Sequence, residues 1–224
     1  MSLMRGFFGG AIAALIIAAP AFAGPTYSFS VSESQVHPSD VGVITLTQVD
    51  TTHVRLSVDL KSGYGFLNTG GPHTPFAFNV SGTGALSIST FSLPVNGIYT
   101  APNGNNYTLS LSTSGGYGNT PYGTYGVAIE SNAGNGSNQA YYGDLLLVLY
   151  RQSGIDTNDF ITNGPSGYYF SADLTDGSST AAAAWKIREI VYGPPPVRIP
   201  EPISLSMMGA GLAGAAMLRR RRKG

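Results

Sequence analysis

Apolar and polar residues alternate over much of the chain, and this pattern constrains its fold more than any other feature. In THVRLSVDLK (52–61), the apolar residues from Val54 to Leu60 share one face, and the polar residues from His53 to Asp59 share the other. A period of two residues indicates a strand with one face in the core and the other in water. The preceding VGVITLTQVD (41–50) and the sequence Asp50-Thr51-Thr52 predict a hairpin with this strand.

Further strand candidates follow at intervals of about ten to fifteen residues, separated by turns rich in Gly, Asn and Pro. They are TYSFSVSES (26–34), PFAFNV (75–80), ALSISTFSL (85–93), NYTLSLS (106–112), GTYGVAIES (123–131), YYGDLLLVLY (141–150) and GYYFSADL (167–174). The segment AAAAWKIREIVY (181–192) is ambiguous, and we favour a last strand with Trp185 and Ile187 facing inward. No strong long helix is predicted, and DTNDFI (156–161) is expected to form one helical turn. The pattern predicts an all-β fold, an antiparallel β-sandwich that is jelly-roll-like.

Charge and cysteine content narrow the function classes. Only 11% of the residues are charged, and residues 24–198 hold eleven acidic and six basic residues, a net charge of −5. This segment has no basic patch, so we expect no nucleic-acid partner. The chain has no cysteine, which rules out disulfides, zinc–thiolate sites and a thiol nucleophile.

The first 23 residues have the features of a signal peptide. Arg5 supplies the positive charge, Gly6–Ala19 is uncharged, and Ala21-Phe22-Ala23 has the small-x-small form that signal peptidase accepts. The uncharged stretch is short for a permanent membrane span. We therefore predict cleavage between Ala23 and Gly24.

In the last 31 residues the apolar stretch comes before the basic residues, which reverses the order found at the N-terminus. A proline-rich spacer (194–202) contains the sequence Pro200-Glu201-Pro202, and sixteen uncharged residues (203–218) follow it. As a helix those sixteen residues would rise about 24 Å, less than the ~30 Å hydrocarbon core, so we expect a marginal transmembrane helix. The basic tail (219–224) is expected to stay cytoplasmic and so to leave the preceding domain outside. Its charged residues are Arg219, Arg220, Arg221, Arg222 and Lys223.

This combination of Pro200-Glu201-Pro202, a short apolar helix and a terminal arginine cluster resembles the PEP-CTERM sorting domain of Gram-negative bacteria. That domain is also labelled "ice-binding protein C-terminal", which is no evidence that this chain binds ice. The resemblance implies that an exosortase, a membrane-embedded protease, recognises and removes the tail. Pro200, Glu201 and Pro202 would then be recognition residues of a substrate and not catalysts. The resemblance also implies release or surface attachment in bacteria that make exopolysaccharide.

Three phrases of the central region resemble a domain that recurs before such tails. They are GFLNTGGPHTPFAFNVSGTG, DLLLVLYRQSGIDTNDFITNG and GYYFSADL. This second resemblance spans about residues 60–175 and brings no known activity.

Few residues point to catalysis or to metal binding. The chain has no nucleophile elbow, Walker loop, dinucleotide fingerprint or complete EF-hand loop. His37, His53 and His73 lack the spacing of metal ligands, and Asp156, Asn158 and Asp159 are an incomplete set of oxygen ligands for calcium. We predict no catalytic residue, no metal and no cofactor.

Tyrosines are the most suggestive residues of the central domain. Tyr117, Tyr122 and Tyr125 lie in GGYGNTPYGTYG, where exposed rings beside Asn and Gly would suit stacking on sugar rings. The alternative is that these rings fill the core and rim of the sandwich, because Tyr has high strand propensity. Both interpretations remain open from the sequence.

Together the patterns predict a signal peptide (1–23), a β-sandwich ectodomain (24–193), a spacer (194–202), a transmembrane helix (203–218) and a basic cytoplasmic tail (219–224). We expect signal peptidase and an exosortase to act on the chain, the membrane to hold it transiently, and exopolysaccharide to be its matrix partner. We favour a non-catalytic structural or adhesive role. The alternatives are a secreted polysaccharide-active enzyme or carbohydrate-binding module, and a retained tail-anchored membrane protein.

Overall fold

The structure of the central domain is a computed structural model that describes residues 26–34, 41–70 and 73–191. The predicted signal peptide with its cleavage residues Ala21, Ala23 and Gly24 lies outside these ranges. The spacer, the transmembrane helix and the basic tail, all within 194–224, also lie outside them. No helix among the described residues is long and apolar enough to cross a membrane.

The described residues form antiparallel strands joined by turns and short 3-10 helices. The strands are β1 (Thr26–Ser34), β2 (Gly42–Asp50), β3 (His53–Leu60), β4 (Gly65–Phe66), β5 (Phe76–Val80), β6 (Ser87–Leu93), β7 (Ile98–Thr100), β8 (Asn106–Ser112), β9 (Tyr117–Gly118), β10 (Thr124–Tyr125), β11 (Val127–Ser131), β12 (Leu145–Tyr150), β13 (Phe160–Ile161), β14 (Phe170–Thr175) and β15 (Thr180–Val191). The 3-10 helices are η1 (Val95–Gly97), η2 (Ser137–Gln139), η3 (Thr157–Asp159) and η4 (Gly164–Ser166). The all-β prediction is confirmed.

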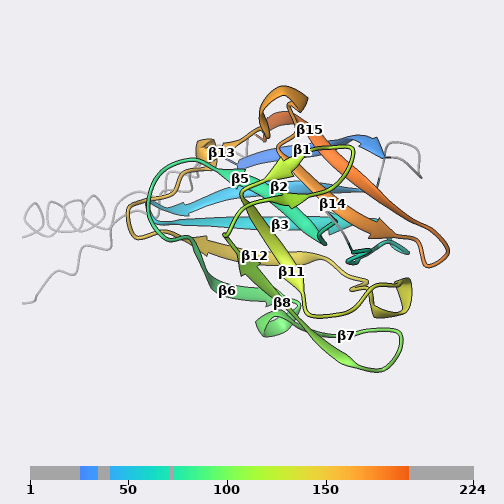
Figure 1. The fold of residues 1–224 in the computed structure, drawn as a ribbon. Helices are drawn as coiled ribbons and strands as arrows, with labels where there is room; N and C mark the ends of the chain where they lie inside the picture. The colour runs from blue at the N-terminus through green and yellow to red at the C-terminus, as the bar shows by residue number, and fades with distance from the viewer. Residues whose placement is uncertain (1–25, 35–40, 71–72, 192–224) are drawn as a thin grey trace, which may run out of the picture.

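Most strands belong to one continuous antiparallel sheet, in the order β6-β12-β3-β2-β1-β15-β14-β5-β11-β8-β7, with β13 beside β5 and β4 beside β14. β9 and β10 form a separate two-stranded sheet. The large sheet folds over itself, so that β2, β3, β12 and β6 lie behind β5, β11 and β8 (Figure 1). The fold is therefore sandwich-like, and the jelly-roll connectivity stays a prediction.

The main core lies between the two halves of the folded sheet. Aromatic rings dominate it on one side: Phe76 lies 5.8 Å from Phe170, and Phe78 lies 5.7 Å from Phe160. Aliphatic residues of β2, β3 and β12 meet them from the other side and are fully buried. Burying large apolar side chains at about 25 cal/mol per Å² supplies the main driving force for a cysteine-free fold.

The first and the last described strands are neighbours near the middle of the sheet. Thr26 of β1 is opposite Val191 of β15, so the chain enters and leaves the domain at the same end (Figure 1). Residues 181–191 thus lie in a strand, as predicted. Trp185 is fully buried, and its indole N–H donates to the Gly42 carbonyl at 3.1 Å. Ile187 was also predicted to face inward, but its side chain is not among those that the structure describes.

Two local predictions are also confirmed. β2 and β3 form a hairpin whose turn is at Thr51-Thr52, and Asp50 accepts hydrogen bonds from the backbone N–H and the hydroxyl of Thr52. The predicted helical turn in DTNDFI is η3, where the Asp156 side chain accepts from the Asn158 N–H and Asp159 completes a capping box. A capping box satisfies backbone N–H groups that lack partners at a helix start.

Candidate functional sites

Four of the tyrosines form a second buried cluster on the opposite side of the sheet from the main core. Tyr117, Tyr122, Tyr125 and Tyr168 are between 2% and 8% exposed. They share this cluster with four alanines of β5, β11 and β15: Ala77, Ala128, Ala182 and Ala184. Because alanine side chains are short, bulky rings can approach the sheet closely there.

Tyr117, Tyr122 and Tyr125, for which the sequence left exposure and burial open, have buried rings. Tyr122 and Tyr168 meet edge to face at 5.2 Å, and the Tyr117 hydroxyl contacts the hydroxyls of Ser112 and Ser114. Burial raises the pKa of Tyr125 to about 12. The rings fill the space over the alanines, as the alternative interpretation held. Carbohydrate contact by these three residues stays a prediction. It was based on exposed ring faces, and these rings are buried.

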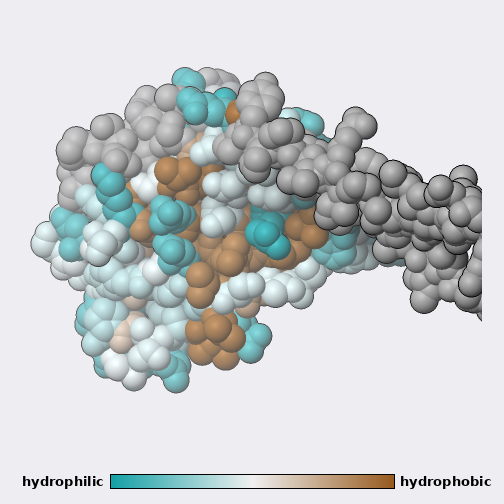
Figure 2. Space-filling view, turned by 180° about the vertical axis from the view of Figure 1, so that it is seen from behind, coloured by the Kyte–Doolittle hydropathy of each residue, from teal (hydrophilic) through white to brown (hydrophobic). Residues whose placement is uncertain are grey.

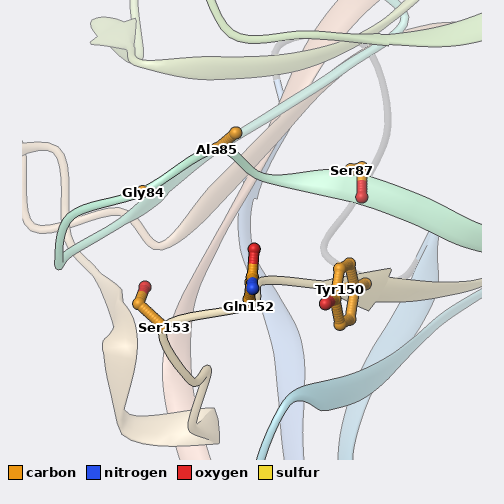
Figure 3. A pocket seen from close by; sticks show the side chains of 6 residues that line it. All are labelled: Gly84, Ala85, Ser87, Tyr150, Gln152 and Ser153. Atoms are coloured by element: carbon orange, nitrogen blue, oxygen red, sulfur yellow. The ribbon is translucent and has the colours of Figure 1, made fainter.

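A different tyrosine lines an open groove of about 390 Å³ between the loop before β6 and the end of β12 (Figure 3). Its lining residues are Gly84, Ala85, Ser87, Tyr150, Gln152 and Ser153. The six residues offer one aromatic ring, three hydroxyls (two of serine and one of tyrosine) and one amide, and none of them is an acidic or basic residue. Such a surface suits a neutral, hydroxyl-rich ligand.

Several contacts hold the groove in shape. The Tyr150 ring lies 4.9 Å from the His53 ring, and the Ser153 hydroxyl donates to the Thr83 carbonyl. Gly84 has a φ of +106°, and a Cβ there would lie 2.8 Å from the Ser153 hydroxyl oxygen. Glycine is therefore the residue that allows the two walls to approach here.

Beside the groove, Asp50 and His53 form an exposed acid–imidazole pair. The His53 Nδ1 lies 2.9 Å from both carboxylate oxygens of Asp50. The hydrogen bond from the Thr52 N–H, followed by that from His53, lowers the pKa of Asp50 to about 2. The carboxylate therefore stays ionised and accepts hydrogen bonds from Thr52 and His53. These features fit a residue that caps a turn and do not fit a general acid.

Arg151 anchors the base of the same region. It is 5% exposed and donates to the carbonyls of Ser81 and Gly154 and to the carboxylate of Asp159. The guanidinium thereby ties the loop after β5 to the loop after β12. Asp159, considered above as a calcium ligand, is instead an ion-pair partner and a capping residue.

A buried carboxylate lies elsewhere, beneath the GFLNTGGPHTP loop. Asp173 is 1% exposed and accepts from the Thr69 N–H at 2.9 Å and from the Thr69 hydroxyl at 2.6 Å. Burial raises its pKa in spite of these bonds. Asp173 also exchanges backbone hydrogen bonds with Leu67 and Thr74, so it fastens the loop to β14. His73 belongs to the same loop, and its buried Nδ1 has no hydrogen-bond partner among the described residues.

The remaining candidate chemistry is not assembled into one site. Among the described residues, no group of three or more His, Asp or Glu is placed to hold a metal ion. Glu130 of β11 is half-buried and is opposite Ser110 of β8, and the side chain of Glu33 lies outside the description.

The groove lined by Tyr150 was not predicted from the sequence. Its available signal was the Gly- and Ser-rich stretch SGTGALS (81–87) before β6.

The domain is thus a β-rich module whose first and last described residues, Thr26 and Val191, lie opposite each other in neighbouring strands. The family model for the PEP-CTERM protein-sorting motif matches residues 198–222. The chain therefore carries a PEP-CTERM sorting motif at its C-terminus, as predicted, and the motif implies that an exosortase processes it. Proteins with this motif are exported and sorted to the membrane or surface of Gram-negative bacteria. No curated protein and no solved structure matches the chain.

Proposed function

We propose that this protein is an exported matrix protein whose β-domain binds neutral exopolysaccharide without acting on it chemically. In this proposal signal peptidase removes residues 1–23, and the helix at 203–218 spans the membrane only until an exosortase processes the tail. Pro200, Glu201 and Pro202 are the residues that the exosortase recognises. The product is then released or held at the cell surface.

The observation that carries the proposal is the pairing of a sorting motif with a polar, uncharged groove. The motif directs the chain toward the exterior, where polysaccharide is the abundant partner implied by the sorting family. The Tyr150 ring offers a stacking surface, and Ser87, Gln152 and Ser153 offer hydrogen bonds for sugar hydroxyls. Glycoside hydrolysis requires two carboxylates beside the substrate, and none of the six lining residues is acidic.

The test is a glycan array and a matrix pull-down with the purified exported chain, combined with a screen for hydrolysis. We expect binding without turnover, and a Tyr150→Ala variant that binds about tenfold more weakly, a loss of about 1.4 kcal/mol. Tyr142→Ala is the matched control, because Tyr142 is an exposed tyrosine (39%) that does not line the groove. Equal binding by the two variants would refute the assignment of the groove.

The two alternatives give different results in the same experiments. Turnover of a polysaccharide that is abolished by a single Asp or Glu substitution would establish a secreted enzyme instead. A chain found in the membrane with Arg219–Lys223 still attached, in cells that make an exosortase, would establish a retained tail-anchored protein.

A further inference from the structure

β12 does not follow the alternation of apolar and polar residues that its neighbour β3 obeys. β12 reads LLLVLY: Leu145, Leu147 and Leu149 face the main core and are fully buried. The intervening residues Leu146, Val148 and Tyr150 face the opposite side and are only partly covered. An antiparallel strand with one face in water normally carries polar residues on that face. β12 therefore has apolar residues on both faces, and its outward face is only partly buried.

Strands on both sides of β12 add to this apolar surface. Leu93 of the adjacent β6 is opposite Leu146 and is 42% exposed. Val43 of β2 lies beyond β3, where it is opposite Asp59, and is 39% exposed. We call Val43, Leu93, Leu146 and Val148 the outer apolar face. Seen from the side opposite to Figure 1, hydrophobic residues form a band across the molecule with hydrophilic residues set into it (Figure 2). Contiguous exposed apolar surface on a soluble domain marks an interaction site.

The charges within this face are arranged so that the face is complementary to itself. Along the outward side of β3 the order is Arg55, Ser57, Asp59, with Arg55 beside Val148 and Ser57 beside Leu146. Arg55 and Asp59 are both exposed, and neither side chain forms an ion pair with another described residue. The positive and negative groups therefore lie at equal sequence distances on either side of Ser57.

We propose that the outer apolar face binds the same face of a second copy of this chain. The two-fold axis lies in the interface, perpendicular to β3 and level with Ser57, so that the two β3 strands run antiparallel. Arg55 of each copy then faces Asp59 of the other, and Leu93 and Leu146 lie near their own counterparts beside the axis. Two sheets packed face to face in this way lie about 10 Å apart. An isologous contact of this kind uses one patch twice and closes at a dimer.

Charge selects this arrangement over the other face-to-face dimer. Rotation about an axis parallel to β3 would bring Arg55 against Arg55 and Asp59 against Asp59, and opposed like charges disfavour such a complex. Pairing through the free edge of β6 is disfavoured for a different reason. The register of β6 on β12 shifts twice, between Leu146 and Leu147 and again between Val148 and Leu149. Such bulges twist an edge strand away from a new partner.

A crosslinking experiment on the full chain tests the position of the axis. Because the chain has no cysteine, a single Ser57→Cys substitution places one thiol per copy beside the axis. We expect a covalent dimer on treatment with a short bismaleimide. Ser110→Cys, at an exposed position on β8, is the control and should stay monomeric. Equal crosslinking of the two variants, or products containing only another protein, would overturn the proposal.

Charge reversal tests the pairing itself and does not depend on thiol chemistry. Arg55→Asp and Asp59→Arg should each weaken the dimer about tenfold or more in sedimentation equilibrium, because each sets like charges against one another. The double variant carries both reversals and should recover most of the lost affinity. Unchanged fluorescence of the single, buried Trp185 would show that all variants are folded. Failure of the double variant to recover would refute the Arg55–Asp59 contact, whatever the polysaccharide experiments show.

Discussion

Replacing Tyr125 by alanine tests whether the tyrosine-rich segment is a core or a binding surface. The ring is 2% exposed and belongs to the cluster that covers the alanines of β5, β11 and β15. Truncating a buried aromatic side chain to alanine costs about 3–5 kcal/mol, from lost transfer free energy and from the cavity that remains. For a domain of this size, about 2–4 °C per kcal/mol converts this loss to a fall in Tm of about 6–20 °C.

The matched variant Tyr125→Phe keeps the ring and removes the hydroxyl. That hydroxyl donates to the Tyr122 carbonyl at 3.4 Å, a long hydrogen bond, so its loss should cost no more than about 1 kcal/mol. Denaturant unfolding of the exported chain can be followed by fluorescence, since Trp185 is the only tryptophan and is fully buried. If Tyr125→Ala unfolds within about 0.5 kcal/mol of the unsubstituted chain, as exposed positions do, the ring is not part of a core.

Three other substitutions have defined outcomes. Burial raises the pKa of Asp173 above its ordinary value of 3.8. The stability that its protonated form contributes is therefore lost as the pH rises from 3.8 through the raised pKa. Across this pH range, the unfolding free energy of Asp173→Asn should depend less on pH than that of the unsubstituted chain. Arg151→Leu should lower the unfolding free energy by about 3 kcal/mol, because the Ser81 and Gly154 carbonyls and the Asp159 carboxylate lose their donor; an effect below about 1 kcal/mol in denaturant melts would contradict this. Glu201→Ala should leave the tail on the exported chain, and intact mass would detect residues 219–223 that the unsubstituted chain has lost.

Strand positions were predictable because alternation is a local property of the chain. The expectation for 26–34 matches β1 from Thr26 to Ser34, and that for 106–112 matches β8 from Asn106 to Ser112. Position in the sheet was not predictable in this way. Nothing in the separate patterns of β1 and β15 indicates that the two strands pair with each other, since that pairing depends on the whole topology.

The segment 181–192 shows where local propensity and tertiary structure disagree. Four consecutive alanines favour a helix, yet they lie in β15. Ala183 packs in the main core, while Ala182 and Ala184 lie under the tyrosine cluster on the other side of the sheet. Small residues are needed on both sides of this strand, and this requirement overrides the helical preference.

Among the candidate sites, too, those formed by contiguous residues could be predicted, and those formed by distant segments could not. The sorting segment could be predicted because its recognition residues are contiguous in the sequence. The groove at Tyr150 could not, because it joins the loop before β6 to the end of β12, which are more than sixty residues apart. For Tyr117, Tyr122 and Tyr125, composition alone did not decide between exposure and burial. The alanines that accept their rings come from three separate strands.

The central claim, that this chain is exported and then processed at both ends, is tested most directly by intact mass. The protein would be isolated from its native host and from the same host without its exosortase. We predict a product in the normal host that begins at Gly24 and lacks Arg219–Lys223, and retention of those five residues when the exosortase is absent. A cytosolic chain with both ends intact in the normal host would contradict the account.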